Sequence, residues 1–178
     1  FAYRGVLGIK EPSAIFFAIG KYYFAHGEYV NAIKYFKKAA ELKPDFAEAY
    51  NNLGVSSYYS GNKDGAIQFL RQAIEIKKDY AKAHYNIALI YFGIKDLDNA
   101  IFHFSYAAQL EPNNANAHFD LAVAYVDRFR EKESDGNIIS SDLGDLKEGL
   151  RHYLKADELK PGFPNALSNV RIVESVIN

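Results

Sequence analysis

The 178-residue chain contains no cysteine, which excludes disulfides and metal sites built on thiolates. The absence fits a reducing compartment, and we expect a cytoplasmic protein. No apolar run approaches the roughly 18–20 residues that a membrane span requires, because Lys21 ends the most apolar stretch at residues 15–19. The sequence begins at Phe1 without an initiator methionine, so we expect a fragment, upstream of which a signal, an anchor or further repeats could lie.

An excess of charge of either sign is also missing. The 21 basic and 22 acidic side chains give a formal net charge of −1, and no basic run is long enough to follow a phosphate backbone. We therefore expect no nucleic-acid partner. No glycine-rich phosphate loop and no nucleophile-elbow serine is present, so the sequence assigns no catalytic residue, no cofactor and no metal. The expectation is a protein that is not an enzyme.

What the sequence does contain is a period of 34 residues. Pro44 and Pro112 lie 68 residues apart, Lys78 lies midway, and a similar six-residue string ends at each of these positions and at Pro161. A fixed period of 34 is typical of a solenoid of helical pairs. The register predicts first helices near Ser13, Ala47, Ala81 and Ala115, and second helices near Tyr29, Lys63, Leu97 and Asp145.

Small and large residues alternate in this register in a way that two packed helices require. The first helices carry a small residue at Gly20, Gly54, Ala88 and Ala122, and the second helices carry a large one at Phe36, Leu70, Phe104 and Tyr153. Small residues let two helices approach closely, and the large residues fill the space beside them. Gly27 and Gly61 supply the backbone freedom for the turns between the helices.

This pattern resembles the tetratricopeptide repeat family over Ser13–Pro161, with Lys78 in place of proline and Gly149 in place of alanine as departures. The resemblance implies an all-α, right-handed α-solenoid of four helix-turn-helix units at residues 13–46, 47–80, 81–114 and 115–161. Residues 162–178 copy the start of a unit, and we interpret them as a C-terminal capping helix; truncation of a longer array is the alternative. One interpretation of residues 1–12 is the remnant of an earlier helix.

The fourth repeat is stretched by 15 residues, and the excess lies at residues 128–143. This segment is polar and predicts a loop between the two helices. Its spacing also resembles an EF-hand calcium loop, with Glu at the first position and Asp at the last; the six positions are Glu131, Glu133, Asp135, Gly136, Ile138 and Asp142. We favour a solvated loop without calcium.

In the family that the chain resembles, the first helices line a concave groove that holds an extended peptide. Carrying these positions over gives a candidate site of ten residues: Lys21, Asn52, Tyr58, Lys82, Tyr85, Asn86, Phe92, Phe119, Asp120 and Asn169. Asn52, Asn86 and Asn169 share one motif position, and Asp120 stands at the same position in the fourth repeat. An amide donates and accepts, so a row of amides can pair with a peptide backbone of any sequence. The alternative is that these asparagines are simply solvated.

The resemblance also permits a test for one specific ligand. Co-chaperone repeats bind the C-terminal carboxylate of heat-shock chaperones through a clamp of basic residues and asparagine, and its positions here read Phe17, Lys21, Asn52, Lys82 and Asn86. Only Asn52 and Lys82 match. Without an arginine the bidentate carboxylate contact is lost, so we do not expect this ligand.

Four histidines recur at two positions of the period. His84 and His118 take a core position that a large aromatic residue usually holds, so we expect packed, neutral imidazoles. His103 and His152 precede the large residues Phe104 and Tyr153, and we expect them to point outward or to lie at the rim. No carboxylate spacing connects them into a metal site.

Together these features predict a scaffold that holds a peptide segment or a partner protein in the concave groove. One alternative is self-assembly, in which the end helices dock into another copy and form a homo-oligomer. A second alternative is the targeting domain of a larger enzyme.

Overall fold

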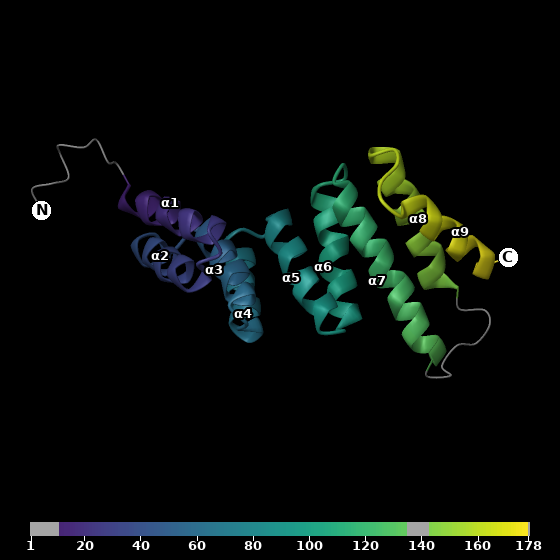
Figure 1. The fold of residues 1–178 in the computed structure, drawn as a ribbon, viewed down its shortest axis with the longest axis horizontal. Helices are drawn as coiled ribbons and strands as arrows, with labels where there is room; N and C mark the ends of the chain where they lie inside the picture. The colour runs from purple at the N-terminus through teal and green to yellow at the C-terminus, as the bar shows by residue number, and fades with distance from the viewer. Residues whose placement is uncertain (1–10, 135–142, 178) are drawn as a thin grey trace, which may run out of the picture. The chain divides into compact units, whose positions relative to one another are not determined.

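The protein is described by a computed structural model that covers residues 11–134 and 143–177. Within these ranges it consists of nine helices and no strand (Figure 1). In chain order they are α1 (Pro12–Ala25), α2 (Tyr29–Leu42), α3 (Ala47–Tyr59), α4 (Lys63–Ile76), α5 (Ala81–Gly93), α6 (Leu97–Leu110), α7 (Ala115–Ser134), α8 (Gly144–Leu159) and α9 (Ala166–Ile177). The predicted all-α architecture of repeated helix pairs is confirmed, and most helices begin at the predicted residue. In the described part of the chain, none of the helices has both the length and the apolar character to cross a membrane.

The helices belong to two compact units, which meet in the sequence between Ala83 and His84. In the first unit α1 packs against α2, α2 against α3, and α3 against α4. In the second unit α6 packs against α7, α7 against α8, and α8 against α9. Within each unit these helices therefore contact their neighbours in sequence, which is the contact pattern expected of a repeat protein.

The turn between the two helices of a repeat uses the same backbone conformation three times. Gly27, Gly61 and Lys95 follow one another at intervals of 34 residues, and their φ angles are 74°, 91° and 64°. Glycine enters this left-handed region without strain, whereas a lysine does so at some cost. The side chains of Asn62 and Asp96 then cap the following helices by accepting from the backbone N–H of Gly65 and Asn99.

The core of each repeat is the predicted pairing of a small residue with a large one. Phe36, Leu70 and Phe104 are among the largest fully buried side chains of the described residues. A Cβ added to Gly20 would lie 2.6 Å from the Phe36 ring, and one added to Gly54 would lie 2.5 Å from Cγ of Leu70. The helices of the first two repeats thus approach so closely that only glycine fits between them.

The last helix carries polar residues where the earlier first helices carry small ones. In α9, Arg171 and Glu174 stand at the positions of Gly54 and Ser57, and both are exposed. The opposite face buries Val170 and Val173 in the core that α9 shares with α7 and α8. The exposed part of α9 is mixed, because Leu167, Ile172 and Val176 are exposed beside Arg171 and Glu174.

The prediction of a loop over residues 128–143 is wrong for its first half. Helix α7 continues to Ser134 because Phe129 is buried in the core, and because Arg128 and Lys132, one helical turn apart, both bind Asp145 near the start of α8. Glu131 and Glu133 of the calcium-loop pattern therefore lie in a helix. The other four positions of that pattern lie outside the described residues.

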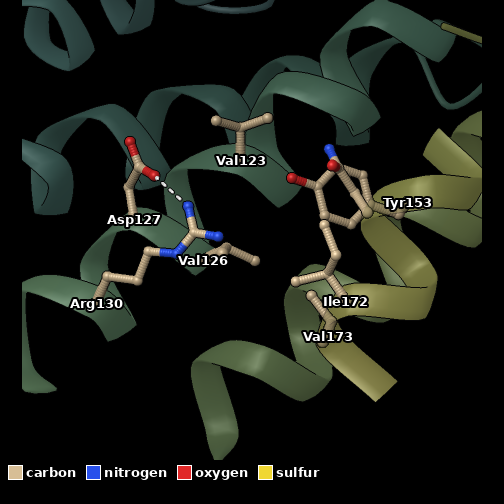
Figure 2. A pocket seen from close by; sticks show the side chains of 8 residues that line it. Val123, Val126, Asp127, Arg130, Tyr153, Ile172 and Val173 are labelled. Atoms are coloured by element: carbon tan, nitrogen blue, oxygen red, sulfur yellow. Dashed lines mark ion pairs between the residues drawn. The ribbon is translucent and has the colours of Figure 1, made fainter. Parts of the chain in front are cut away.

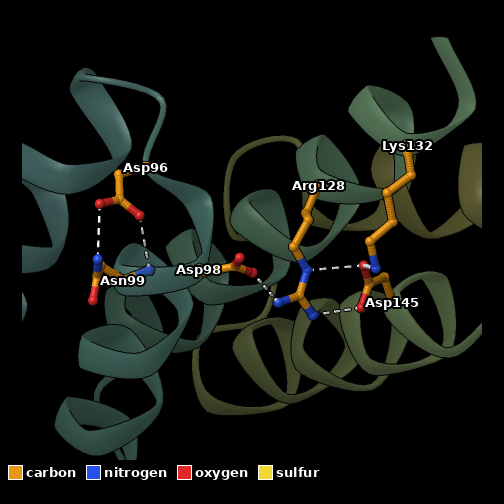
Figure 3. Close-up of polar contacts among 6 residues, drawn as sticks. All are labelled: Asp96, Asp98, Asn99, Arg128, Lys132 and Asp145. Carbon is orange, nitrogen blue, oxygen red and sulfur yellow. Dashed lines mark hydrogen bonds and ion pairs between the residues drawn. The ribbon is translucent and has the colours of Figure 1, made fainter. Parts of the chain in front are cut away.

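Figure 3 shows the ion-pair network that supports this longer helix. The Arg128 guanidinium donates two hydrogen bonds to Asp145, at 2.9 and 2.6 Å, and a third to Asp98 at 2.7 Å; Lys132 adds one to Asp145 at 3.0 Å. Burial alone would raise the pKa of Asp145, but the hydrogen bonds from Arg128 and Lys132 outweigh burial and hold it below its usual value. Three helices, α6, α7 and α8, are connected through one guanidinium.

We expect Asp145→Asn to lower the free energy of unfolding by about 1.5 kcal/mol, since Arg128 and Lys132 lose the anion that they share in a partly buried site. The matched control is Glu158→Gln, which removes an exposed carboxylate of the same helix from a 3.0 Å ion pair with Lys155. That change is expected to cost less than about 0.5 kcal/mol. Urea unfolding followed by circular dichroism measures both, and equal losses would show that the network adds nothing beyond a surface pair.

Candidate functional site

The four residues at the shared motif position lie in four different helices. Asn52 is in α3, Asn86 in α5, Asp120 in α7 and Asn169 in α9, and each side chain is half-buried. Asn52 uses its amide Nδ2 to donate to the backbone oxygen of Glu48 at 2.7 Å. This bond uses one of the two N–H groups of the amide, so the second N–H and the carbonyl oxygen remain to serve a ligand.

In the second unit Asp120, which holds the shared motif position in α7, is hydrogen-bonded to a tyrosine. The hydroxyl of Tyr85 in α5 donates to the Asp120 carboxylate at 2.5 Å. Burial raises the pKa of Asp120, and the hydrogen bond from Tyr85 counteracts part of that rise. The pKa of Tyr85 is also raised, first by burial and then by its contact with Asp120. No basic side chain within residues 11–134 and 143–177 forms an ion pair with Asp120.

A small pocket of about 130 Å³ opens between α7, α8 and α9, which we call the α9 pocket. Its lining consists of Val123, Val126, Asp127, Arg130, Tyr153, Asn169, Ile172 and Val173. Figure 2 shows the aliphatic side chains of Val126, Ile172 and Val173 with Asp127 and Arg130 on one side and Tyr153 on the other. The pocket therefore combines aliphatic side chains with charged and polar ones, a common arrangement where a side chain of a ligand is recognised.

Two ion pairs at the rim share one carboxylate. Asp127 lies 3.7 Å from Arg130 and 3.5 Å from Lys95. The same Lys95 lies over the ring of Phe92, with Nζ 5.4 Å from the ring centre. Phe92 is thus connected to the pocket rim through Lys95 and Asp127.

Tyr153 connects the pocket with the shared motif position. Burial raises its pKa to about 12, a side-chain hydrogen bond with Asn169 works against that rise, and the negative charges of Asp127 and Asp120 add to it. Its ring also packs against Phe119, with ring centres 5.4 Å apart, and Phe119 contacts Phe163 at 4.9 Å. In the second unit the structure therefore brings Tyr85, Asp120, Phe119 and Asn169 into one connected surface.

Two predicted site residues of the first unit, Lys21 and Tyr58, contact aromatic rings. Lys21 lies over Phe17 at 5.3 Å, and Tyr58 meets Tyr59 edge-on at 5.7 Å. Phe17 itself packs against Phe36 and Phe46 at the core. Lys82 is exposed. Several rings expected to face a ligand are thus partly covered by one another.

Comparison with known families gives two kinds of match. A family model described as "TPR repeat" matches residues 20–58 and 56–95, and one described as "Tetratricopeptide repeat" matches residues 81–114. Together they span more than half of the chain. The chain belongs to the tetratricopeptide repeat family. A comparison with curated proteins finds no match.

Solved TPR structures are similar to this chain in fold. A crystal structure of the MamA protein is 22% identical, with a TM-score of 0.75 over 92% of this chain and 81% of that one. The protein YrrB, described as a TPR protein with an unusual peptide-binding site, is 18% identical, with a TM-score of 0.73 over 93% and 78% of the two chains. The first TPR of Spaghetti (RPAP3), bound to the HSP90 peptide SRMEEVD, is 22% identical, with a TM-score of 0.61 over 63% and 89%. These similarities support the shared fold.

In the third and fourth TPR repeats the histidines form pairs. Nδ1 of His84 lies 3.0 Å from Nδ1 of His103, and Nδ1 of His118 lies 2.8 Å from Nδ1 of His152. The prediction of buried rings at His84 and His118 is confirmed, but the prediction that His152 points outward is wrong, because only 6% of it is exposed. His103 is half-buried. In the fourth repeat the second helix therefore buries not only the large residue of the pattern, Tyr153, but also the residue before it, His152.

The same two positions hold aromatic pairs in the first two TPR repeats, where the residues are Phe16 and Tyr35, and Tyr50 and Phe69. A third ring completes a stack in three of the repeats: Tyr23 stacks on Tyr35, Tyr91 on His103 and Tyr125 on His152, with interplanar angles of 5°, 6° and 8°. The histidine pairs are therefore a substitution within a repeated packing motif.

Sequence reasoning missed Ile172 and Arg130 as residues of the α9 pocket. Ile172 takes the position of Val55, Leu89 and Val123 in the repeat register, so the alignment of α9 with the earlier helices contained the signal. Arg130 could not be found in this way, because it lies in the stretch that the sequence predicts as loop. Its place in a helix follows only from the structure.

Proposed function

We propose that this TPR chain is a non-catalytic scaffold that binds a peptide segment of a partner protein along the first helices of its repeats. The observation that carries the proposal is that half-buried amides recur at one motif position, and that one of them, Asn169, lines an open pocket with several aliphatic side chains. Amides can pair with the backbone of the segment, and the pocket can take one of its side chains. The peptide-bound structure of the RPAP3 repeat, which has the same fold, is consistent with this use.

The histidines and acidic residues give no competing catalytic interpretation. Within the described residues, no group of three or more histidine or acidic side chains is placed to hold a metal ion. The buried histidines are occupied with one another, and Asp120 with Tyr85. A binding role uses the exposed features of the described part of the chain, where the buried histidines and Asp120 already have partners.

A co-precipitation experiment tests the proposal. We expect Asn52→Ala/Asn86→Ala, which removes one amide from each unit, to recover about tenfold less partner than the wild type, because each lost hydrogen bond weakens binding by about 0.5–1.5 kcal/mol. The matched control is Asn31→Ala/Asn99→Ala. These two exposed asparagines share a position on the second helices, α2 and α6, and bond to neighbouring acidic side chains. Equal recovery by both double variants would place the binding site elsewhere.

A further inference from the structure

Asp120 differs in charge alone from Asn52, Asn86 and Asn169, the other residues of the row at the shared motif position. Asn52, Asn86 and Asn169 have nearly the same shape, and an asparagine at position 120 could also donate to a peptide carbonyl. A carboxylate cannot donate, so it serves a peptide backbone less well than an amide does. Its presence in this row indicates that the ligand has something other than a backbone carbonyl at this point.

The charge of Asp120 has no cation to balance it among the described residues. Its contact is the hydroxyl of Tyr85 at 2.5 Å, whereas Lys95 and the pocket residue Arg130 pair with Asp127 instead. A half-buried carboxylate attracts a basic group more strongly than a solvated one, because less water screens the interaction. This site therefore fits an arginine or lysine and disfavours an acidic side chain.

The α9 pocket lies close to Asp120. Tyr153 lines the pocket, and its pKa is raised in part by the charge of Asp120. Phe119, the residue before Asp120, packs against the Tyr153 ring. The pocket volume of about 130 Å³ and its lining of Val123, Ile172 and Val173 suit one aliphatic side chain.

We propose that the segment bound by the second unit carries an arginine or lysine that pairs with Asp120 and, within a few residues, an aliphatic side chain that enters the α9 pocket. This inference rests on the proposed peptide-binding function and adds the chemistry of the ligand. Tyr85 holds the carboxylate in place, and Asn169 lies at the pocket beside the aliphatic group.

The experiment selects peptides from a random dodecapeptide phage library on the immobilised full chain. The wild type is expected to enrich sequences in which a basic residue lies near leucine, isoleucine or valine. Asp120→Asn restores the residue of the other repeats, so it is expected to fold, which circular dichroism checks, and to lose the basic preference while keeping the aliphatic one. Ile172→Gln, at a side chain that is 51% exposed, is expected to do the reverse.

The affinity of one enriched peptide gives the magnitude. Fluorescence anisotropy is expected to show binding to Asp120→Asn about tenfold to hundredfold weaker than to the wild type, the range for losing a hydrogen bond to a charged group. Glu133→Gln is the matched control, because it removes an exposed carboxylate from the same helix, α7. Its affinity is expected to equal that of the wild type.

The outcomes separate the two proposals. If the wild type enriches no sequence at all, peptide binding itself is contradicted. If it enriches peptides without basic residues, or if the basic preference and affinity survive Asp120→Asn, peptide binding stands and the assignment of Asp120 is overturned. Loss of affinity to the same extent in Glu133→Gln would also overturn it, since a general charge effect would then explain the result.

Discussion

Replacing Gly54 by alanine is expected to destabilise the first unit by about 2 kcal/mol, although alanine is the better helix former by roughly 1 kcal/mol. The added Cβ would lie 2.5 Å from Cγ of Leu70 and 3.0 Å from the backbone oxygen of Ala66, both in α4. Leu70 is fully buried and cannot move aside. The two helices would have to separate, and the packing that holds α3 against α4 would loosen. Urea unfolding followed by circular dichroism measures the loss.

A double variant shows whether the steric contact is the cause. Leu70→Ala alone is expected to cost about 3 kcal/mol through the cavity that it leaves. Gly54→Ala/Leu70→Ala should be less destabilised than the sum of the two changes by about 1 kcal/mol or more, because the new methyl group then has room. Additive losses would mean that Gly54 is required for a reason other than its contact with Leu70.

The sequence predicts that Gly54 and Leu70 meet, but it does not predict how closely they approach. The period of 34 places a small residue opposite a large one in every repeat, and the buried pairs follow that pattern. Whether glycine is obligatory or alanine suffices depends on the distance between the two helices. Repeats three and four use Ala88 and Ala122 at this position, and both are fully buried. Spacing in a sequence sets which residues meet, whereas their distance is a property of the packed structure.

The candidate site was predictable to a similar extent. The shared motif position of Asn52, Asn86, Asp120 and Asn169 follows from the period, and so does the place of Val123 beside it. The hydrogen bond between Tyr85 and Asp120 joins residues 35 apart and depends on the rotation of two helices. The pairing of Asp127 with Lys95 and Arg130, which leaves Asp120 without a cation in the described part of the chain, likewise could not be inferred from spacing.

The buried histidine pair of the fourth repeat is expected to make the chain less stable as the pH falls below about 6.5. Nε2 of His118 must donate to the carbonyl oxygen of Pro112 at 3.1 Å, so in the neutral ring Nδ1 is the acceptor. His152 therefore donates from Nδ1 at 2.8 Å, and its Nε2 accepts from Arg151 at 2.9 Å. Every ring nitrogen has a partner, and the pair holds one proton between its two Nδ1 atoms.

A further proton has no acceptor in this arrangement. A proton added to Nδ1 of His118 would place two N–H groups face to face across the 2.8 Å contact, and one added to Nε2 of His152 would face the N–H of Arg151 at 2.9 Å. The pKa of His152 is lowered to about 4, first by burial and then by Arg151 and His118, while Glu148 works against them. Burial also lowers the pKa of His118, with Lys155 and Arg151 adding to the effect and the bond to Pro112 opposing it. The other polar side chains that line this side are Ser105, Gln109 and Tyr125.

The direction of the pH dependence follows from these lowered values. Between about pH 6.5 and pH 4 the unfolded chain binds protons that the folded pair excludes, so acid favours the unfolded state. After allowance for solvent screening near Arg151, we expect the free energy of unfolding to fall by about 2 kcal/mol over this window. Urea unfolding at a series of pH values measures the slope.

The repeats themselves supply the control for this measurement. His118→Phe/His152→Tyr installs the pair found in the first repeat, where Phe16 and Tyr35 stack with ring centres 6.4 Å apart and no histidine is involved. The variant should fold, because the position accepts these rings elsewhere in the chain, and should lose most of the slope between pH 6.5 and 5. Carboxylates, which titrate mainly below pH 5, are common to both proteins and cancel in the comparison. An unchanged slope would assign the pH dependence to other groups and contradict the role of the pair.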